Sequence, residues 1–339
     1  MFLYKRRPKQ LGRHTPNLWP VWLVAPLALI LVGAVAYGLY QGADALLRAE
    51  NTGRKPVPVQ DVIKTTVTVL TLVGAVLAGM YAYRKQLLDE GASHRADAAQ
   101  LAERYTTAAE QLGHDQAAVR LAGAHAMARL ADDWPEQRQV CIDVLCAYLR
   151  MHYEPDSSTA GFKTGEREVR LTITRIIRDH LQDPTAATTW CGCDLDFTGA
   201  VFDGGDFRDS RFSGGRVNFS GATFSGSGVH FIRSTFSGGM VFFTGATFSG
   251  GMVSFARSTF SGSEVYFTRA TFSGGMVSFT GATFSGGMVS FAESAFSGSE
   301  ILFRDSTLSG SEVRFLGLRV DGAAFIDWGP FPAIPDNQH

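Results

Sequence analysis

The chain has 339 residues, enough for two or three domains, and a formal net charge of only −1. A charge so close to zero excludes a global electrostatic field that would favour binding to nucleic acid. Glycine (37 residues) and phenylalanine (25 residues) are abundant, and the four cysteines show no disulfide framework.

Two apolar segments near the N-terminus predict a membrane hairpin. A basic tail, residues 1–17, precedes 23 uncharged residues from Leu18 to Tyr40, and a polar connector, residues 41–64, leads to a second apolar run, Thr65–Tyr83. The first run is long enough to span a bilayer. It is too long for the apolar core of a cleaved signal peptide, and a second run follows it. We predict two transmembrane helices; the alternative for the second is a buried helix of a soluble domain.

Basic residues around these segments set the expected orientation. The tail holds five Lys and Arg residues, the connector holds four, and Arg84 and Lys85 directly follow the second segment. The positive-inside rule then favours a two-pass protein of the plasma membrane with both termini in the cytoplasm. The charges of the connector oppose this orientation, so the inverse topology stays open.

Residues 84–185 predict a helical stalk followed by a small helical domain. Asp115–Leu130 carries apolar residues at i, i+3 or i+4, and i+7, which indicates an amphipathic helix. Its Val119-Arg120 pattern is similar to the second helix of a HEAT repeat. A similar pattern recurs about 50 residues later, in Glu168–Leu171. The resemblance implies a stack of four to five helices of a kind that binds peptides or proteins. The stalk, Gln86–His114, has a candidate buried stripe formed by Leu87, Leu101, Tyr105, Ala108 and Leu112.

Two series of phenylalanines, each with a period of 12, organise residues 191–328. Ala or Ser stands two positions before most members of one series, and Val or Ile stands two before members of the other. Positions i and i−2 of an extended chain face the same side, so both are expected in an interior. Leu308 and Phe315 continue the two series. The predicted structural ladder comprises Phe212, Phe219, Phe224, Phe231, Phe236, Phe243, Phe248, Phe255, Phe260, Phe267, Phe272, Phe279, Phe284, Phe291, Phe296 and Phe303.

A large apolar residue every five positions, with a small residue two before it, resembles the pentapeptide-repeat family. Phe197, Phe202, Phe207 and Phe212 fit this spacing best. After Phe212 every second unit carries two extra residues, usually within Ser-Gly-Gly-Met or Ser-Gly-Ser-Glu, which we interpret as a widened corner with glycines at positive φ. The helical segment around Arg104–Leu121 is also similar to the region before the repeats in many membrane-anchored bacterial members.

The resemblance implies a right-handed quadrilateral β-helix, so the expected fold class is a membrane-anchored α + β-solenoid. If the four faces of a coil take five, seven, five and seven residues, one coil uses two 12-residue periods of the ladder. We therefore expect a 24-residue coil and five to six coils. The alternative is one 12-residue turn per coil, a tube too thin to hold stacked Phe rings. Toward the C-terminus Leu308 and Val320 replace Phe, and Ala323–Trp328 is the expected cap. Three prolines follow, so residues 329–339 are expected to form a disordered tail.

Cys191 and Cys193, with His180 nearby, are the strongest candidates for a metal site. A closed zinc site needs four ligands, so Cys141 and Cys146 would have to join them. The simpler interpretation places Cys191 and Cys193 in the first turn of the solenoid, as small residues before the repeat. We therefore predict no metal, no cofactor and no catalytic residues.

Three aspartates crowd the first coil, and arginines alternate with them. Asp203, Asp206 and Asp209 are interleaved with Arg208 and Arg211. We interpret this cluster as a solvated face rather than as a calcium or acid–base site.

The predicted function is a non-enzymatic, membrane-tethered scaffold that presents a β-solenoid to a protein partner. One alternative is a metal- or small-molecule-handling domain around Cys191 and Cys193. A second is a DNA mimic that modulates topoisomerases, as some pentapeptide-repeat proteins are. Residues 194–327 hold 12 acidic residues and nine arginines, a net charge of −3. DNA carries one charge per about 1.7 Å, so no nucleic-acid role is expected.

Overall fold

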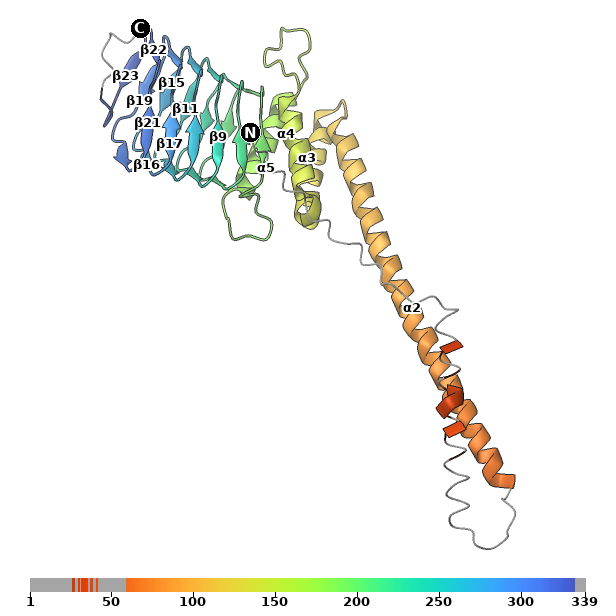
Figure 1. Cartoon of the computed structure of the whole chain (residues 1–339). Helices are drawn as coiled ribbons and strands as arrows, with labels where there is room; N and C mark the ends of the chain where they lie inside the picture. Colours follow the sequence, from red (N-terminus) through yellow and green to blue (C-terminus); the bar gives the residue numbers. More distant parts are fainter. Residues whose placement is uncertain are drawn as a thin grey trace. The chain divides into compact units, whose positions relative to one another are not determined.

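The computed structural model describes residues 59–332, together with helical positions scattered between Pro26 and Gln41 (Figure 1). The chain divides into two compact units, Met1–Ala99 and Gln100–His339.

The first unit holds most of the long helix α2 (Val59–Leu112). Within it, Val67–Asp89 is long and apolar enough to cross a membrane, judged by length and composition, and none of its apolar window is buried. It is the one such helix in the described part of the chain. The first predicted span, Leu18–Tyr40, and the basic tail lie largely or wholly outside the described residues. The two-pass arrangement therefore stays a prediction.

A small helical domain opens the second unit. The end of α2 packs with α3 (Ala117–Asp133), the 3-10 turn η1 (Pro135–Gln137), α4 (Arg138–Arg150) and α5 (Glu166–His180). The close approach of α3 to α2 depends on Gly123, where an added Cβ would lie 2.6 Å from the Leu112 amide nitrogen.

The predicted buried stripe of the stalk is only partly realised. Ala108 and Leu112 are buried in the helical core, and Leu101 and Tyr105 pack half-buried against it. Leu87 lies in the first unit and is half-exposed. The stripe therefore begins where α2 enters the helical domain.

The repeat region forms a four-sided solenoid of about six turns, built from four parallel sheets. Face A contains β1 (Leu195–Asp196), β5 (Arg216–Asn218), β9 (Met240–Phe242), β13 (Glu264–Tyr266), β17 (Met288–Ser290) and β21 (Glu312–Arg314). Face B contains β2 (Val201–Phe202), β6 (Thr223–Phe224), β10 (Thr247–Phe248), β14 (Thr271–Phe272), β18 (Ala295–Phe296) and β22 (Arg319–Val320). Face C contains β3 (Gly205–Asp206), β7 (Val229–His230), β11 (Met252–Ser254), β15 (Met276–Ser278), β19 (Glu300–Leu302) and β23 (Phe325–Asp327). Face D contains β4 (Arg211–Ser213), β8 (Thr235–Ser237), β12 (Thr259–Ser261), β16 (Thr283–Ser285) and β20 (Thr307–Ser309).

Strand register decides the length of a coil. Thr247 pairs with Thr271, and Val265 pairs with Val289, so strands that are neighbours in a sheet lie two periods of the ladder apart in the sequence. Residues one period apart, such as Phe248 and Phe260, belong to opposite faces B and D. The 24-residue coil is confirmed and the 12-residue alternative is wrong. The first coil is shorter on two faces, where Leu195 pairs with Val217 and Val201 pairs with Thr223.

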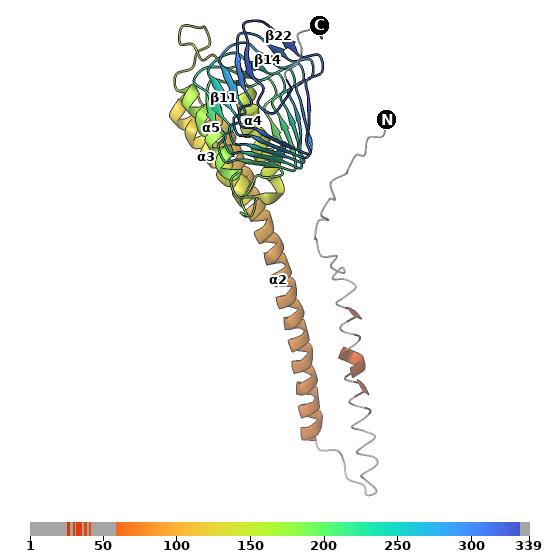
Figure 2. The same ribbon diagram turned by 90° about the vertical axis from the view of Figure 1, so that its left-hand side faces the viewer.

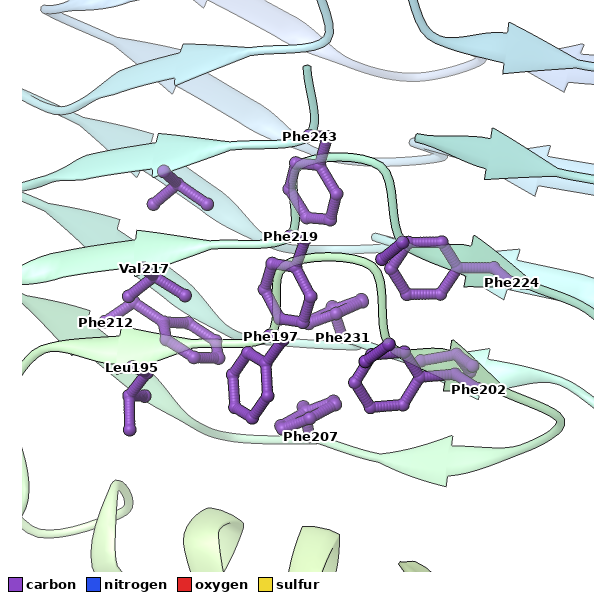
Figure 3. Close-up of a cluster of buried hydrophobic side chains, with 14 of the residues drawn as sticks. Leu195, Phe197, Phe202, Phe207, Phe212, Val217, Phe219, Phe224, Phe231 and Phe243 are labelled. Carbon is purple, nitrogen blue, oxygen red and sulfur yellow. The ribbon is translucent and has the colours of Figure 1, made fainter. Parts of the chain in front are cut away.

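Phenylalanine rings fill the interior in continuous columns (Figure 3). Phe219, Phe243 and Phe267 stack face to face, with ring centroids 4.9 and 4.7 Å apart and interplanar angles of 3° and 4°. Rings of neighbouring columns meet edge to face, as Phe243 and Phe255 do at 5.7 Å. All sixteen members of the predicted ladder are buried. Each buried Phe contributes about 1.5–3 kcal/mol through apolar area removed from water.

Two kinds of corner join the faces. Tight corners carry a hydrogen bond from residue i+3 to residue i, as from the Ala222 amide to the Phe219 carbonyl at 3.0 Å. At most wide corners the two extra residues expected from the sequence are a glycine pair. At Gly287 an added Cβ would lie 2.2 Å from the Ser263 carbonyl oxygen of the coil below. Only glycine allows the coils to approach this closely.

At most positions where serine replaces alanine two residues before an interior Phe, the serine hydroxyl is hydrogen-bonded; Ser210, before Phe212, is the exception. The Ser258 Oγ donates to the Phe231 carbonyl at 2.6 Å, and Ser234 does the same to Phe207 at 2.7 Å. Both serines are fully buried. This bond explains why both small residues occur in the repeat.

The C-terminal end departs from the expected ladder. Leu308 pairs in register with Phe284, yet it is 45% exposed and does not fill the interior. Phe331 is buried instead and contacts Phe284 and Phe303 edge to face. Phe331 therefore belongs to the core, although the sequence analysis assigned residues from 329 onward to a tail. Residues 333–339 lie outside the described part of the chain.

Candidate interaction surface

Face A carries a pair of stacked aromatic side chains that point outward. Phe242 and Tyr266 lie in register on β9 and β13, with ring centroids 5.4 Å apart and an interplanar angle of 7°. Successive side chains of a strand point to opposite sides. Val241 precedes Phe242 and Val265 precedes Tyr266; both valines are buried in the core, so the two aromatic rings point outward. The sequence analysis followed the buried series and did not single out this pair. The signal was an aromatic residue at a position that is polar or charged in the other coils of this face.

Other side chains complete this surface. Met240, 38% exposed, and the half-buried Met288 lie in the same outward column as Glu264. The Tyr266 hydroxyl donates to the Glu264 carboxylate at 2.8 Å, and this bond raises the pKa of Tyr266 above its ordinary value. The Arg216 guanidinium carbon lies 5.9 Å from the centroid of the Phe242 ring. We call Met240, Phe242, Tyr266 and Met288 the aromatic patch.

The remaining faces are chemically different. Faces B and D present threonine and serine, as Thr259 and Ser261 on β12. Face C presents methionines, as Met252 on β11, and a single exposed aromatic residue, Phe325 on β23. Face A differs in carrying two outward aromatic rings that stack in register on neighbouring strands.

The helical domain covers the first coil of the solenoid. Helix α5 packs against β3, and α4 packs against β1, at the green end of the rod (Figure 1 and Figure 2). Arg178 on α5 pairs with Asp206 at 2.6 Å, and Arg150 on α4 pairs with Asp196 at 2.5 Å. These ion pairs join the helical domain to the first coil of the solenoid, and apolar side chains of both pack in one core beside them.

The aspartate cluster of the first coil is thus only partly a solvated face. Asp203 is buried, accepts a hydrogen bond from the Tyr153 hydroxyl at 2.8 Å and pairs with Arg167 at 3.0 Å. Asp209 does lie at the surface, where it pairs with Arg233 at 2.7 Å. Arg208 pairs with Asp206 at 2.8 Å. The helical partners Tyr153, Arg167 and Arg178 were missed because nothing in the local sequence brings them to the repeat.

The four cysteines fall into two environments. Cys141 and Cys146 are buried in the helical core, where burial raises their pKa to about 11 and about 12. Cys191 and Cys193 are half-buried in the loop before β1, as the simpler interpretation expected. His180 lies 3.2 Å from Asp132 and stacks on Trp190 at 4.2 Å. Within residues 59–332 no three His, Cys, Asp or Glu side chains form a metal-like group.

A small cavity lies beside Cys193. Its volume is about 10 Å³, and Trp190, Phe212 and Val217 help to line it. That space accommodates at most one water molecule. The cavity therefore gives no support to a small-molecule site around Cys191 and Cys193.

Comparison with protein families agrees with the geometry. Residues 243–295 match the family model described as pentapeptide repeats, in nine copies. The central part of the solenoid is built of pentapeptide repeats. These pentapeptide repeats contain Tyr266 and Met288 of the aromatic patch. No curated protein matches the chain.

Proposed function

We propose that this protein is a non-enzymatic, membrane-tethered scaffold whose pentapeptide-repeat domain binds a protein partner through face A. The observation that carries the proposal is the outward stack of Phe242 on Tyr266. Aromatic side chains and methionine are enriched at protein interfaces, and aromatic anchors supply much of the binding energy there. The Arg216 guanidinium lies at one edge of the patch, as charged groups do in a polar rim. Glu264 lies within the patch, between Met240 and Met288, and its carboxylate accepts the hydrogen bond of the Tyr266 hydroxyl.

Rigidity supports the same proposal. The two rings are fixed by paired strands and by the Phe columns beneath them, such as Phe243 on Phe267 at 4.7 Å. A surface that is already ordered loses little conformational entropy when a partner binds. The ordered solenoid can therefore bind a partner without first changing its own conformation.

The tether is proposed from the apolar segments. Val67–Asp89 has the length and composition of a membrane span, and the sequence predicts a second at Leu18–Tyr40. We propose that both spans cross the plasma membrane and that both termini are cytoplasmic. Reporter fusions at His339 and after Glu50 test this: we expect a cytoplasmic signal at His339 and an external one after Glu50. An external signal at His339 would reverse the orientation.

Photo-crosslinking from defined positions tests the binding surface. A photoreactive amino acid placed at Tyr266 in the full-length membrane protein is expected to give one discrete crosslinked product. The same amino acid at Thr259, on face D, is the matched control and should give none. The product from position 266 should disappear when Phe242→Asp is added, because the carboxylate destroys the apolar contact. Equal crosslinking from both positions would contradict the assignment to face A.

A further inference from the structure

The aromatic patch surrounds a carboxylate that has no positive charge beside it. Glu264 lies on β13, and its in-register neighbours on β9 and β17 are Met240 and Met288. It is exposed and accepts one hydrogen bond, from the Tyr266 hydroxyl at 2.8 Å. Within residues 59–332 no basic side chain forms an ion pair with Glu264. The centre of the patch therefore carries an uncompensated negative charge.

The arginines of face A do not neutralise this charge. Face A carries two of them, Arg216 on β5 and Arg314 on β21, and each lies two strands away from β13 in the sheet. Neighbouring strands are about 4.8 Å apart, so these strands lie roughly 10 Å from the strand of Glu264. Arg314 is already bound to Glu312, through hydrogen bonds of 2.5 and 2.8 Å. Water therefore provides most of the solvation of the Glu264 carboxylate.

A partner that covers the aromatic patch removes this water. Apolar groups packed on Met240, Phe242 and Tyr266 would also cover Glu264, which lies among them. A charge that loses its water without a partner is strongly unfavourable, whereas one that gains an opposite charge and hydrogen bonds recovers much of that cost. The patch therefore favours a partner that places a cation at Glu264.

The Tyr266 ring favours a planar cation. Phe242 stacks on one face of this ring. The in-register neighbour on the other side is the small Ser290, and no ring or guanidinium of the described residues stacks on that face. A guanidinium is planar, stacks on aromatic faces and donates two parallel hydrogen bonds to a carboxylate, whereas an ammonium is a compact point charge. Arginine therefore matches both the ring and the carboxylate.

We infer that the partner bound at face A inserts an arginine whose guanidinium stacks on the Ser290 side of the Tyr266 ring and pairs with Glu264. The hydrogen bond from Tyr266 holds the carboxylate next to the ring for this contact. Apolar side chains on either side of that arginine contact Met240 and Met288, which flank Glu264 in the same outward column. The inference rests on the proposed binding at face A and adds the chemistry of the partner.

Selection of random peptides displayed on phage, with the full-length protein immobilised in detergent, tests the inference. The wild type is expected to select peptides that carry an arginine between apolar residues. Fluorescence anisotropy then measures the affinity of the strongest peptide. Lysine in place of its arginine should weaken binding about tenfold, because one of two hydrogen bonds to the charged carboxylate is lost. Glu264→Gln should weaken it roughly 30-fold, because the buried arginine loses its opposite charge.

The matched control is Glu300→Gln on face C. Glu300 also lies in register with a methionine, Met276, and has no ion pair in the described chain, so this variant should bind the peptide as the wild type does. Glutamine at position 264 still offers an oxygen to the Tyr266 hydroxyl, so Glu264→Gln removes the charge and keeps the hydrogen bond.

Phe242→Asp separates the inference from the proposed function. Peptides that bind Phe242→Asp as tightly as the wild type would overturn face A as the binding surface and the inference with it, as would failure to select any peptide. Peptides that require Phe242 but carry no arginine would overturn the inference alone. Peptides that require Phe242 and bind Glu264→Gln as tightly as the wild type would do the same.

Discussion

Phe331 lies edge-on against Phe303, with ring centroids 5.1 Å apart and an interplanar angle of 83°. Its backbone follows a sharp turn, because Gly329 has φ +54° and an added Cβ there would lie 2.0 Å from the Phe303 carbonyl oxygen. The last core residue is therefore held in place by a glycine two positions earlier.

Removing this ring should weaken the end of the rod. Phe331→Ala is expected to cost about 3 kcal/mol in free energy of unfolding, the low end of the usual Phe→Ala range, because a terminal coil can relax around the lost ring. Gly329→Ala should have a similar effect through backbone strain and displacement of Phe331. Denaturant unfolding followed by circular dichroism measures both. An unchanged midpoint for Phe331→Ala would contradict its place in the core.

A mid-rod lesion should be more severe. Phe255 is fully buried between Phe231 and Phe279, each 4.9 Å away, so Phe255→Asp buries an unpaired carboxylate at a cost of several kcal/mol. Arg257→Asp changes an exposed corner residue at φ +56°, a conformation that Asp tolerates, and should stay within about ±0.5 kcal/mol. Thermal melts compare them. If Arg257→Asp proves the worse variant, the inward assignment of the ladder is wrong.

Acid should weaken the junction between α5 and the first coil. Burial alone would raise the pKa of Asp206, but hydrogen bonds from Arg208 and the charges of Arg178 and Arg208 outweigh it and hold the pKa well below its usual range. A depressed carboxyl pKa adds stability that is present above the unfolded-state value, about 3.9, and is lost as pH falls toward the folded-state value. Asp206→Asn should therefore cost roughly 1 kcal/mol at pH 7, since the pair is partly solvent-screened.

The pH profile separates this effect from a general packing defect. Melting temperatures of wild type and Asp206→Asn should differ most at neutral pH and converge as pH falls below about 4. Asp305→Asn, at an exposed corner of a later coil, is the control and should follow the wild type at every pH. A constant difference between Asp206→Asn and wild type across the range would contradict the ion-pair explanation.

Thiol reactivity should sort the cysteines by burial. At pH 8 very little of Cys141 or Cys146 is thiolate, because burial raises their pKa to about 11 and about 12. Iodoacetamide should therefore modify the half-buried Cys191 and Cys193 first, and Cys141 and Cys146 only after unfolding. Peptide mass spectrometry over time measures the order. Rapid native-state labelling of Cys146 would contradict the packing of α4.

Metal content tests the remaining alternative for the loop before β1. We expect the purified full-length protein to contain no stoichiometric zinc, since His180 is engaged by Asp132 and Trp190 rather than by Cys191. Elemental analysis of wild type and Cys191→Ser provides the measurement. One zinc per chain that is lost in Cys191→Ser would replace the scaffold proposal with a metal-handling one.

The sequence determined which residues of the repeat face inward. Val241 and Phe243, or Ala246 and Phe248, sit two positions apart on an extended chain, and the direction of a side chain on a strand is set by that local geometry. The same spacing located the two-residue insertions that became wide corners. The burial of the Phe ladder therefore follows from the spacing alone.

Tertiary structure decided what stands opposite each residue. Spacing placed Leu308 inside, but no further coil covers it, and Phe331 fills the interior from a position much further along the chain. Spacing also left Asp203 in solvent, whereas Tyr153 and Arg167 reach it from the helical domain. Side-chain direction is a local property of the backbone. Whether a side chain is buried, and which group it pairs with, also depends on segments that are distant in the sequence and adjacent in the fold. No short-range pattern specifies those contacts.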